Sequence, residues 1–171
     1  MSEKADTSLD DEGEQRIIVR RQASSHSVTS RQIIRAVQAA LDGRPARSIS
    51  VAIVDDASMA ALHERYLGDD RPTDVLAFDL REDPAAGAID GEIVVSAETA
   101  ARAATRLKVD AGEELLRYAI HGTLHLAGFN DHTPAGRRRM RAEENRILAS
   151  FSRVGGARRV RTRKRRVSSG G

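Results

Sequence analysis

The chain has 171 residues, of which 40% are hydrophobic and 31% are charged, and its formal net charge is +3. No segment approaches the roughly 20 consecutive apolar residues of a membrane-spanning helix, and the acidic N-terminus lacks the pattern of a secretory signal, so we expect a cytoplasmic protein without membrane contact. Because the sequence contains no Cys, it excludes disulfides, thiol nucleophiles and thiolate metal sites. Any transition metal must therefore be held by His, Asp or Glu.

Charged residues divide the chain into three segments. Residues 1–15 hold six acidic residues and one Lys, which predicts an acidic, disordered tail. Residues 16–151 balance 19 basic against 19 acidic residues, and we expect them to form the single folded domain. Residues 152–171 hold eight basic residues and no acid, among Gly and Ser, which predicts a basic, disordered tail.

The basic tail has two interpretations. A dense run of Arg complements phosphate, which favours contact with nucleic acid. A solvated tail that only aids solubility accounts for the same composition. The candidate RNA-binding residues are Arg158, Arg159, Arg161, Arg163, Lys164, Arg165 and Arg166.

The first half of the central segment alternates between strand and helix patterns. RIIVR at 16–20 is a short apolar run flanked by charge, which predicts a strand. Apolar residues recur at helical spacing over 28–41, with Ser30 as a candidate N-cap, so we expect an amphipathic helix there. The alternating SISVAIV at 48–54 predicts a half-buried strand. Either of the two aspartates that follow can cap a helix over 55–66.

The second half contains two more strands and three helices. We expect the strands at 75–80 and 89–95, and the helices at 97–107, 110–126 and 134–151, the last of which is very basic at 137–141. Asp74, in the PTD before the first of these strands, is explained by a turn, and Ser96 by a helix N-cap. The fold class is therefore α/β (α+β), with a small mixed sheet and surrounding helices.

Ligand-type side chains gather at the end of the helix over 110–126. His121 and His125 lie four residues apart, so both imidazoles project from one helix face. Gly128 permits a tight reversal, after which Asp131 and His132 return towards the pair. Such a His pair also arises by chance on a helix surface, but the polar residues that follow favour a metal site. Two His and one later ligand leave one position open, as in catalytic zinc sites.

A zincin protease is the obvious alternative for this helix, because it also carries two His at this spacing. That mechanism needs a Glu directly after the first His as general base. Here that position is Gly122, and no acid lies between the two histidines. The sequence therefore disfavours peptide hydrolysis and favours hydrolysis assisted by a metal-bound water.

Three motifs resemble those of the YbeY family, bacterial metal-dependent endoribonucleases of ribosomal RNA maturation and ribosome quality control. HGTLHLAGFNDH at 121–132 resembles the signature H-G-x-L-H-L-x-G-[YF]-x-H. YLGDDRPTDVLAF at 66–78 resembles Y-R-x-K-D-x-P-T-D-V-L-S-F, and GEIVVS at 91–96 resembles G-[DE]-I-x-I-S. The resemblance covers most of 50–150.

The resemblance implies a hydrolase, namely a single-strand-specific, zinc-dependent endoribonuclease that acts in rRNA processing. It also implies one Zn²⁺ per chain, held by the three ligands of the signature. Expected partners are single-stranded RNA or rRNA precursors, and the ribosome or ribosomal proteins. A ribosome-assembly factor with a structural zinc and little catalysis is the main alternative, and a metalloprotease is the third.

The third metal ligand is ambiguous in this chain. In an ungapped alignment the family's third His falls ten residues after His121, where this sequence has Asp131, and His132 follows one residue later. The family tends to keep a Met in its next helix, and Met140 matches it in the same register. Asp binds zinc through oxygen at a distance similar to that of a His nitrogen. We therefore expect His121, His125 and Asp131 to hold the metal, with His132 as the alternative third ligand.

A second departure from the family pattern is Leu67, where the family usually has an Arg that is thought to serve RNA binding and catalysis. Leucine cannot attract a phosphate or stabilise developing negative charge. Arg65 and Arg71 are the neighbouring cations that can contact phosphate instead. The sequence does not identify the general base. Attack on the phosphodiester by water and attack by the RNA's own 2′-hydroxyl are equally compatible with it.

Overall fold

The computed structural model describes residues 5–6, 16–23, 28–69, 73–83 and 87–155. Arg71 and the candidate RNA-binding residues 158–166 lie outside this part of the chain. The last helix extends to Gly155 and therefore passes the expected end of the folded segment at 151. None of the helices in the described part is long and apolar enough to span a membrane.

A mixed sheet forms the centre of the fold, as the sequence predicts. Its strand order is β1-β2-β3-β5-β4, and the strands are β1 (Ala5–Asp6), β2 (Arg16–Arg21), β3 (Ala46–Val54), β4 (Val75–Asp79) and β5 (Ile89–Ser96). The central strands β2, β3 and β5 are parallel, whereas β1 and β4 run antiparallel to their neighbours. Parallel neighbours need crossover connections, which α1 and α2 help to supply here.

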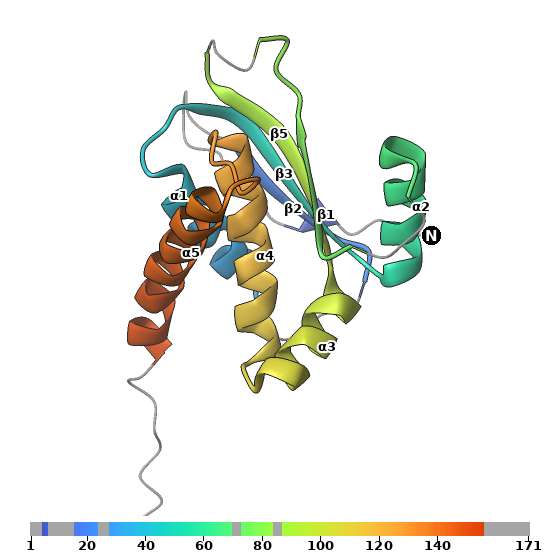
Figure 1. Ribbon diagram of the computed structural model, residues 1–171, viewed down its shortest axis with the longest axis vertical. Helices are drawn as coiled ribbons and strands as arrows, with labels where there is room; N and C mark the ends of the chain where they lie inside the picture. Colours follow the sequence, from blue (N-terminus) through green and yellow to red (C-terminus); the bar gives the residue numbers. More distant parts are fainter. Residues whose placement is uncertain (1–4, 7–15, 24–27, 70–72, 84–86, 156–171) are drawn as a thin grey trace, which may run out of the picture.

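Helices cover the two faces of the sheet unequally. They are α1 (Ser30–Leu41), α2 (Asp56–Leu67), α3 (Ala97–Leu107), α4 (Ala111–Leu126) and α5 (Pro134–Gly155). Figure 1 shows α1, α4 and α5 on one side of the sheet and α2 on the other. The main core lies under α1, α4 and α5, and its fully buried members include Ile33, Ile53, Ile93, Leu115, Ile120 and Ile147. A small second core under α2 contains Ala52, Val54, Met59, Leu76 and Val94.

Side-chain caps fix most of the helix starts that the sequence indicates, with one correction. Asp55 and Ser96 are the N-caps of α2 and α3. The N-cap of α1 is Thr29, not Ser30. Thr29 is extended, its hydroxyl accepts the Gln32 N–H at 3.2 Å, and its own N–H donates to the Gln32 side chain at 2.8 Å. This reciprocal pair satisfies two backbone donors, which Ser30 inside the first turn cannot do.

A carboxylate at the start of α2 attaches that helix to α3. Asp56 accepts hydrogen bonds from Ser96, Thr99 and Arg102. Burial raises the pKa of Asp56, but the hydrogen bonds from these three side chains outweigh it and lower the pKa to about 2. The carboxylate is therefore ionised at neutral pH and stabilises the contact between the two helices.

Two glycines let α4 lie directly on β5. A Cβ at Gly122 would come within 2.7 Å of the Ile93 side chain, and one at Gly91 within 2.6 Å of Leu126. Real Cβ atoms do not approach so closely, so both positions favour glycine for packing. Gly122 therefore serves the helix–sheet contact, and a side chain there would face Ile93 in the core.

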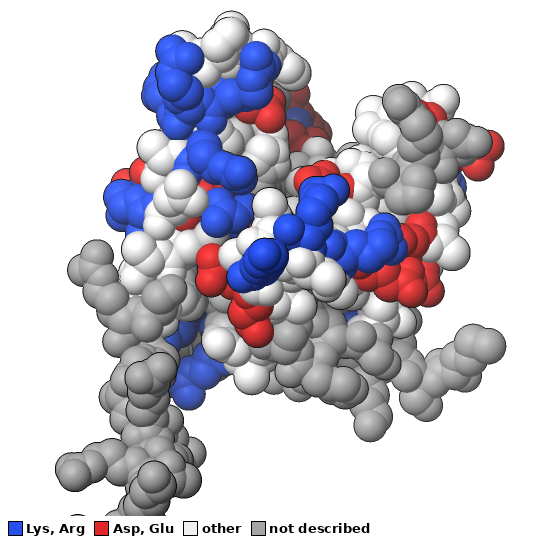
Figure 2. All heavy atoms as spheres, turned by 60° about the horizontal axis from the view of Figure 1, so that its bottom comes forward, with Lys and Arg blue, Asp and Glu red and all other residues white. Residues whose placement is uncertain are grey.

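The surface charge is uneven. Figure 2 shows one group of Lys and Arg side chains on the left of the molecule, the side on which α5 lies in Figure 1, and another group near the centre. Acidic side chains lie among them and also form separate groups further right. The two signs are therefore not evenly mixed over this face.

Candidate metal centre

The two histidines of the signature lie on the last turns of α4, as the sequence predicts. His121 and His125 are both half-buried, and their Nε2 atoms are 2.9 Å apart. One helical turn separates them, so both rings project from the same face. The helix ends at Leu126, and Gly128 follows with φ of +89°, a left-handed conformation that glycine adopts without strain.

The loop after Gly128 returns a carboxylate to the histidine pair. Asp131 Oδ2 lies 3.9 Å from the Nε2 atoms of both His121 and His125. Zinc bonds of 2.0–2.1 Å in a tetrahedral site place neighbouring ligand atoms about 3.3 Å apart. The three observed separations bracket that value, and no other group of three His or acidic ligand atoms within 4.8 Å of one another occurs in the described part. The donor set therefore fits a zinc ion.

His132, the alternative third ligand, is exposed and does not join this cluster. Its backbone N–H donates to the Asn130 side chain at 2.7 Å, which shapes the loop. Of the two candidates for the third metal ligand, the loop therefore places Asp131, and not His132, next to the histidine pair.

The outer nitrogen of each histidine has its own acceptor. His121 Nδ1 lies 2.8 Å from Glu144 Oε1, and His125 Nδ1 lies 3.2 Å from the Phe129 carbonyl oxygen. A carbonyl or carboxylate oxygen only accepts, so both Nδ1 atoms carry hydrogen. In the neutral rings both Nε2 lone pairs then face each other at 2.9 Å, which is repulsive unless a proton or a metal ion lies between them. The hydrogen bonds thus prepare both Nε2 atoms for a cation.

The two rings are affected differently by their surroundings. Burial lowers the pKa of His121, but its hydrogen bond to Glu144 and the charges of Glu144 and Asp131 outweigh this, and the pKa lies above its usual value. Burial and the nearby charge of His121 lower the pKa of His125. His125 is therefore the ring that stays neutral more readily. At His121 a proton competes with the metal for the ring nitrogen.

Glu144 is a buried carboxylate that connects His121 to a cation. It is only 4% exposed, and Arg117 Nη1 lies 3.1 Å from its other oxygen. Burial raises the pKa of Glu144, but His121 and Arg117 outweigh it and hold the pKa below its usual value. The ionised carboxylate thus orients the imidazole and fixes its tautomer.

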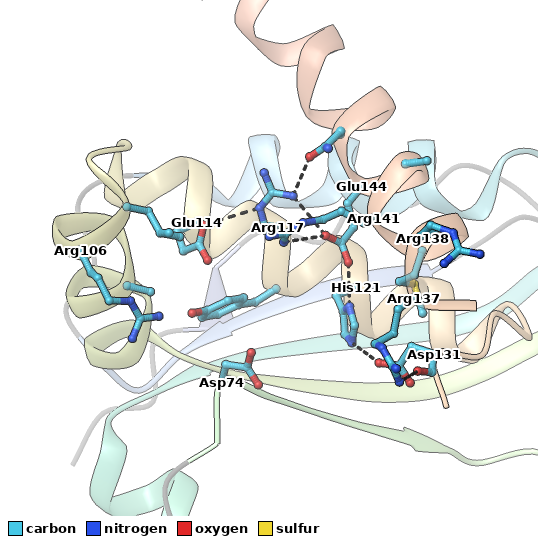
Figure 3. A pocket seen from close by; sticks show the side chains of 16 residues that line it. Asp74, Arg106, Glu114, Arg117, His121, Asp131, Arg137, Arg138, Arg141 and Glu144 are labelled. Carbon is cyan, nitrogen blue, oxygen red and sulfur yellow. Dashed lines mark hydrogen bonds and ion pairs between the residues drawn. The ribbon is translucent and has the colours of Figure 1, made fainter. Parts of the chain in front are cut away.

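Two members of the metal cluster, His121 and Asp131, lie on the wall of a groove of about 830 Å³ between α3, α4, α5 and the start of β4. Figure 3 shows His121 and Asp131 on one side and Asp74 on another. Asp74 Oδ1 accepts the Val75 N–H at 2.9 Å, which agrees with the predicted turn into a strand. Burial, and then the charges of Glu114 and Asp74, raise the pKa of Tyr118 on the groove wall to about 12, so its hydroxyl stays protonated.

Of the two candidate cations near Leu67, only Arg65 is in the described part of the chain, and it does not line this groove. The Arg65 guanidinium lies over the Tyr66 ring on α2, 5.6 Å from the ring centroid, and Arg65 is not among the residues that line the groove. Arg71 lies outside the described residues. Leu67 itself is 63% exposed at the end of α2.

The groove contains functional side chains that our sequence analysis did not single out. Glu144 is the clearest, and it has a recognisable signal, because it stands between the buried Met140 and Ile147 at helical spacing. An acid on the apolar stripe of a helix is expected to have a buried partner. Arg117 has no such signal, since an Arg on an amphipathic helix is ordinary.

Comparisons with known proteins identify the family of this chain. The family model described as endoribonuclease YbeY matches residues 12–152. The endoribonuclease YbeY of Anaeromyxobacter sp. (strain Fw109-5) is 42% identical over 115 residues, which are 67% of this chain and 60% of that protein. The chain thus spans less than two thirds of that relative. The endoribonuclease YbeY of Geobacter sulfurreducens is 31% identical over 147 residues, which are 78% of this chain and 94% of that protein.

The fold also matches a solved structure. The solution structure of TM1509 from Thermotoga maritima covers 86% of this chain and 99% of its own, with a TM-score of 0.57 and 22% sequence identity. At that identity the likeness supports the fold alone. The match of the family model to most of the sequence, together with the two relatives, shows that the chain belongs to the YbeY family.

Proposed function

We propose that this chain is a zinc-dependent endoribonuclease that cuts single-stranded RNA during ribosomal RNA processing. The observation that carries the proposal is the pair of Nε2 atoms of His121 and His125, which face each other with both outer nitrogens hydrogen-bonded and with Asp131 beside them. Two of these donors, His121 and Asp131, lie on the wall of an open groove, where an extended substrate has access.

The protein residues have separable roles in this proposal. His121, His125 and Asp131 hold the ion, and Glu144 keeps the His121 Nδ1 proton so that Nε2 is free to bind. When bound, zinc supplies a Lewis acid that activates water and polarises the phosphodiester. Tyr118 offers a protonated hydroxyl on the groove wall at neutral pH.

The number of ligands distinguishes this function from a structural zinc. Structural sites are closed by four protein ligands, whereas catalytic sites have three and leave one position for water or substrate. The cluster in the described part supplies three: His121, His125 and Asp131. A zincin-type protease is disfavoured because Gly122 packs against Ile93 in the core and offers no general base.

The proposal extends to the surroundings of the enzyme. Ribosomal RNA precursors and the ribosome or its proteins are the proposed partners, and the cytoplasm is the proposed compartment. The basic residues from Arg158 to Arg166 are a proposed further contact for RNA, because a dense Arg run attracts phosphate. Residues 16–151 are the proposed catalytic domain.

The test is cleavage of a labelled single-stranded RNA by the full chain, with and without zinc. We expect the RNA to be cut only when metal is present, and we expect no cleavage of a casein-like peptide. His125→Ala removes one ligand and should abolish both metal retention and cleavage. His63→Ala, on α2 and away from the groove, is the matched control and should keep both. Intact RNA in the presence of zinc, or equal cleavage by His125→Ala, would contradict the proposal.

A further inference from the structure

The position at which the family usually carries an Arg raises the question of which cations contact the substrate phosphate. Leu67 is apolar and 63% exposed, and the Arg65 guanidinium lies over the Tyr66 ring. Among the described residues neither Leu67 nor Arg65 lines the groove that contains the metal cluster. Within the described part of the chain, the cations that can neutralise a phosphate bound next to the cluster therefore come from other elements.

The first turns of α5 place three arginines on the wall of this groove. Arg137, Arg138 and Arg141 all line it, and Figure 3 shows their side chains on the α5 side of His121 and Asp131. Spacings of three and four residues put Arg141 on the same helix face as the other two. We call these three residues the α5 arginines.

One of the α5 arginines is fixed beside the third metal ligand. Arg137 Nη1 donates to the carbonyl oxygens of Asp131 and His132 at 3.1 and 3.2 Å. Both acceptors are neutral, so these bonds position the guanidinium without neutralising its charge. A planar guanidinium offers five donors, and those not used here suit a phosphate.

The other two α5 arginines also keep most of their charge uncompensated. Within the described part of the chain no hydrogen bond or ion pair of Arg138 is present. Arg141 is 64% exposed and lies 3.7 Å from Glu144, a carboxylate that already has Arg117 and His121 as closer partners. Glu144 is shared with these two closer partners, so it compensates little of the charge of Arg141.

The acids that line the groove do not cancel this charge. Glu114 and Glu144 are buried and face Arg117, and Asp131 belongs to the metal cluster. Asp74 is the remaining carboxylate of the lining, and its Oδ1 is bonded to a backbone N–H. The outer wall of the groove along α5 is therefore positive, and a bound divalent ion adds to that potential.

We propose that Arg137, Arg138 and Arg141 form the phosphate-binding site of the groove, and that they hold the RNA backbone next to the metal in place of a cation at position 67. This inference rests on the proposed endoribonuclease function and deepens it. The ligand is a single-stranded polyanion that follows α5 past Asp131, where its phosphates meet the three guanidinium groups in succession.

Binding without cleavage tests the site separately from catalysis. The probe is a fluorescent single-stranded RNA with 2′-O-methyl groups, checked on a gel to remain uncut, and the protein is the zinc-loaded full chain. Fluorescence anisotropy gives the dissociation constant at several salt concentrations. Each phosphate contact on a single strand contributes about 0.7 to the salt slope, so R137Q/R138Q/R141Q should lower it by about 2 and weaken binding at least about tenfold at 0.1 M salt.

The control removes the same charge elsewhere. R16Q/R20Q/R31Q changes three exposed arginines of β2 and α1 outside the groove and should leave affinity and slope close to the wild-type values. Zinc content is measured for every variant, because Arg137 contacts the loop that carries Asp131.

A pair of single variants keeps the test decisive if the triple variant loses metal or stability. Arg138→Gln should lower the slope by about 0.7. Arg139→Gln should not, because its guanidinium lies 5.9 Å over the Phe129 ring and Arg139 does not line the groove. Equal RNA affinity and equal salt slope of these two variants would overturn the α5 site. Cleavage of RNA by the wild-type protein would still support the proposed function in that case. A wild-type protein that neither binds nor cuts RNA would refute both.

Discussion

Replacing Glu144 tests whether a buried carboxylate prepares the metal centre without touching the metal. Glu144 is 4% exposed and accepts from His121 Nδ1 at 2.8 Å and from Arg117 at 3.1 Å. Loss of such a partner of a ligating His typically costs ten- to a hundredfold in metal affinity. That range equals about 1.4–2.8 kcal/mol of binding free energy, and we expect Glu144→Ala to fall within it.

The same substitution should also destabilise the metal-free fold. Breaking one side of a buried ion pair costs about 3–5 kcal/mol when the other side is left without a partner. Arg117 retains Asn145 at 2.9 Å and Glu114 at 3.6 Å, so we expect a loss near or below the lower end, at about 3 kcal/mol. Glu144→Gln keeps the volume and one acceptor, and should lose less of both stability and affinity.

Two measurements separate the effects. Competition with a chromogenic chelator at fixed pH gives the zinc affinity, and urea unfolding of the metal-free protein gives the free energy of unfolding. Glu143→Gln is the matched control, because Glu143 pairs with Arg146 on the same helix but does not line the groove. Unchanged zinc affinity in both Glu144 variants would refute the proposed orientation of His121.

Three further predictions concern the loop, the third ligand and the attachment of α2. Asp131→Ala should lower zinc affinity by at least about a hundredfold and His132→Ala by clearly less, in the same chelator assay. Gly136→Ala should weaken zinc binding without changing a ligand. A Cβ there overlaps the carbonyl oxygen of Asn130, the residue before Asp131, so the loop that carries this ligand must shift. Such overpacking typically costs about 1–3 kcal/mol. The pKa of Asp56 is lowered from 3.8 to about 2, so its stabilisation is present above pH 4 and is lost as the pH falls towards 2. Asp56→Asn should therefore lose roughly 2 kcal/mol at pH 7 by urea unfolding, and its stability should fall less steeply between pH 4 and 2.

Most elements of the fold were predictable because their patterns are local. The exception is the two-residue strand β1, which pairs with β2 although it lies in the segment expected to be a disordered acidic tail. The helix over 97–107 has the predicted bounds, and the strand over 75–79 ends one residue early. The N-cap of α1 was misplaced because Thr29 and Ser30 both have a hydroxyl. The Gln three residues after Thr29 is the signal that distinguishes them, since it completes the capping box.

The arrangement of the elements was not predictable in the same way. Strand order depends on which crossovers bury the most apolar surface, and no local pattern states that β5 lies between β3 and β4. Nor does a local pattern place α2 on the face of the sheet opposite α4, where Figure 1 shows it. This position is why Arg65, a neighbour of Leu67 in sequence, does not line the metal groove, whereas α5 arginines more than 70 residues away do.

Gly122 directly follows the first histidine of the signature, and the packing that requires a glycine there also limits the chemistry of the site. Because α4 lies against Ile93, residue 122 faces the sheet, whereas His121 lines the groove and His125 faces His121. The position after the first His therefore lies away from any metal held by the pair, and a general base there would point into the core. In our proposal the catalytic groups come instead from the groove walls, where α5 carries Arg137, Arg138 and Arg141 and the loop before it carries Asp131. The sequence pattern and the packing thus both argue against a general base at position 122, and our proposal places the substrate along α5.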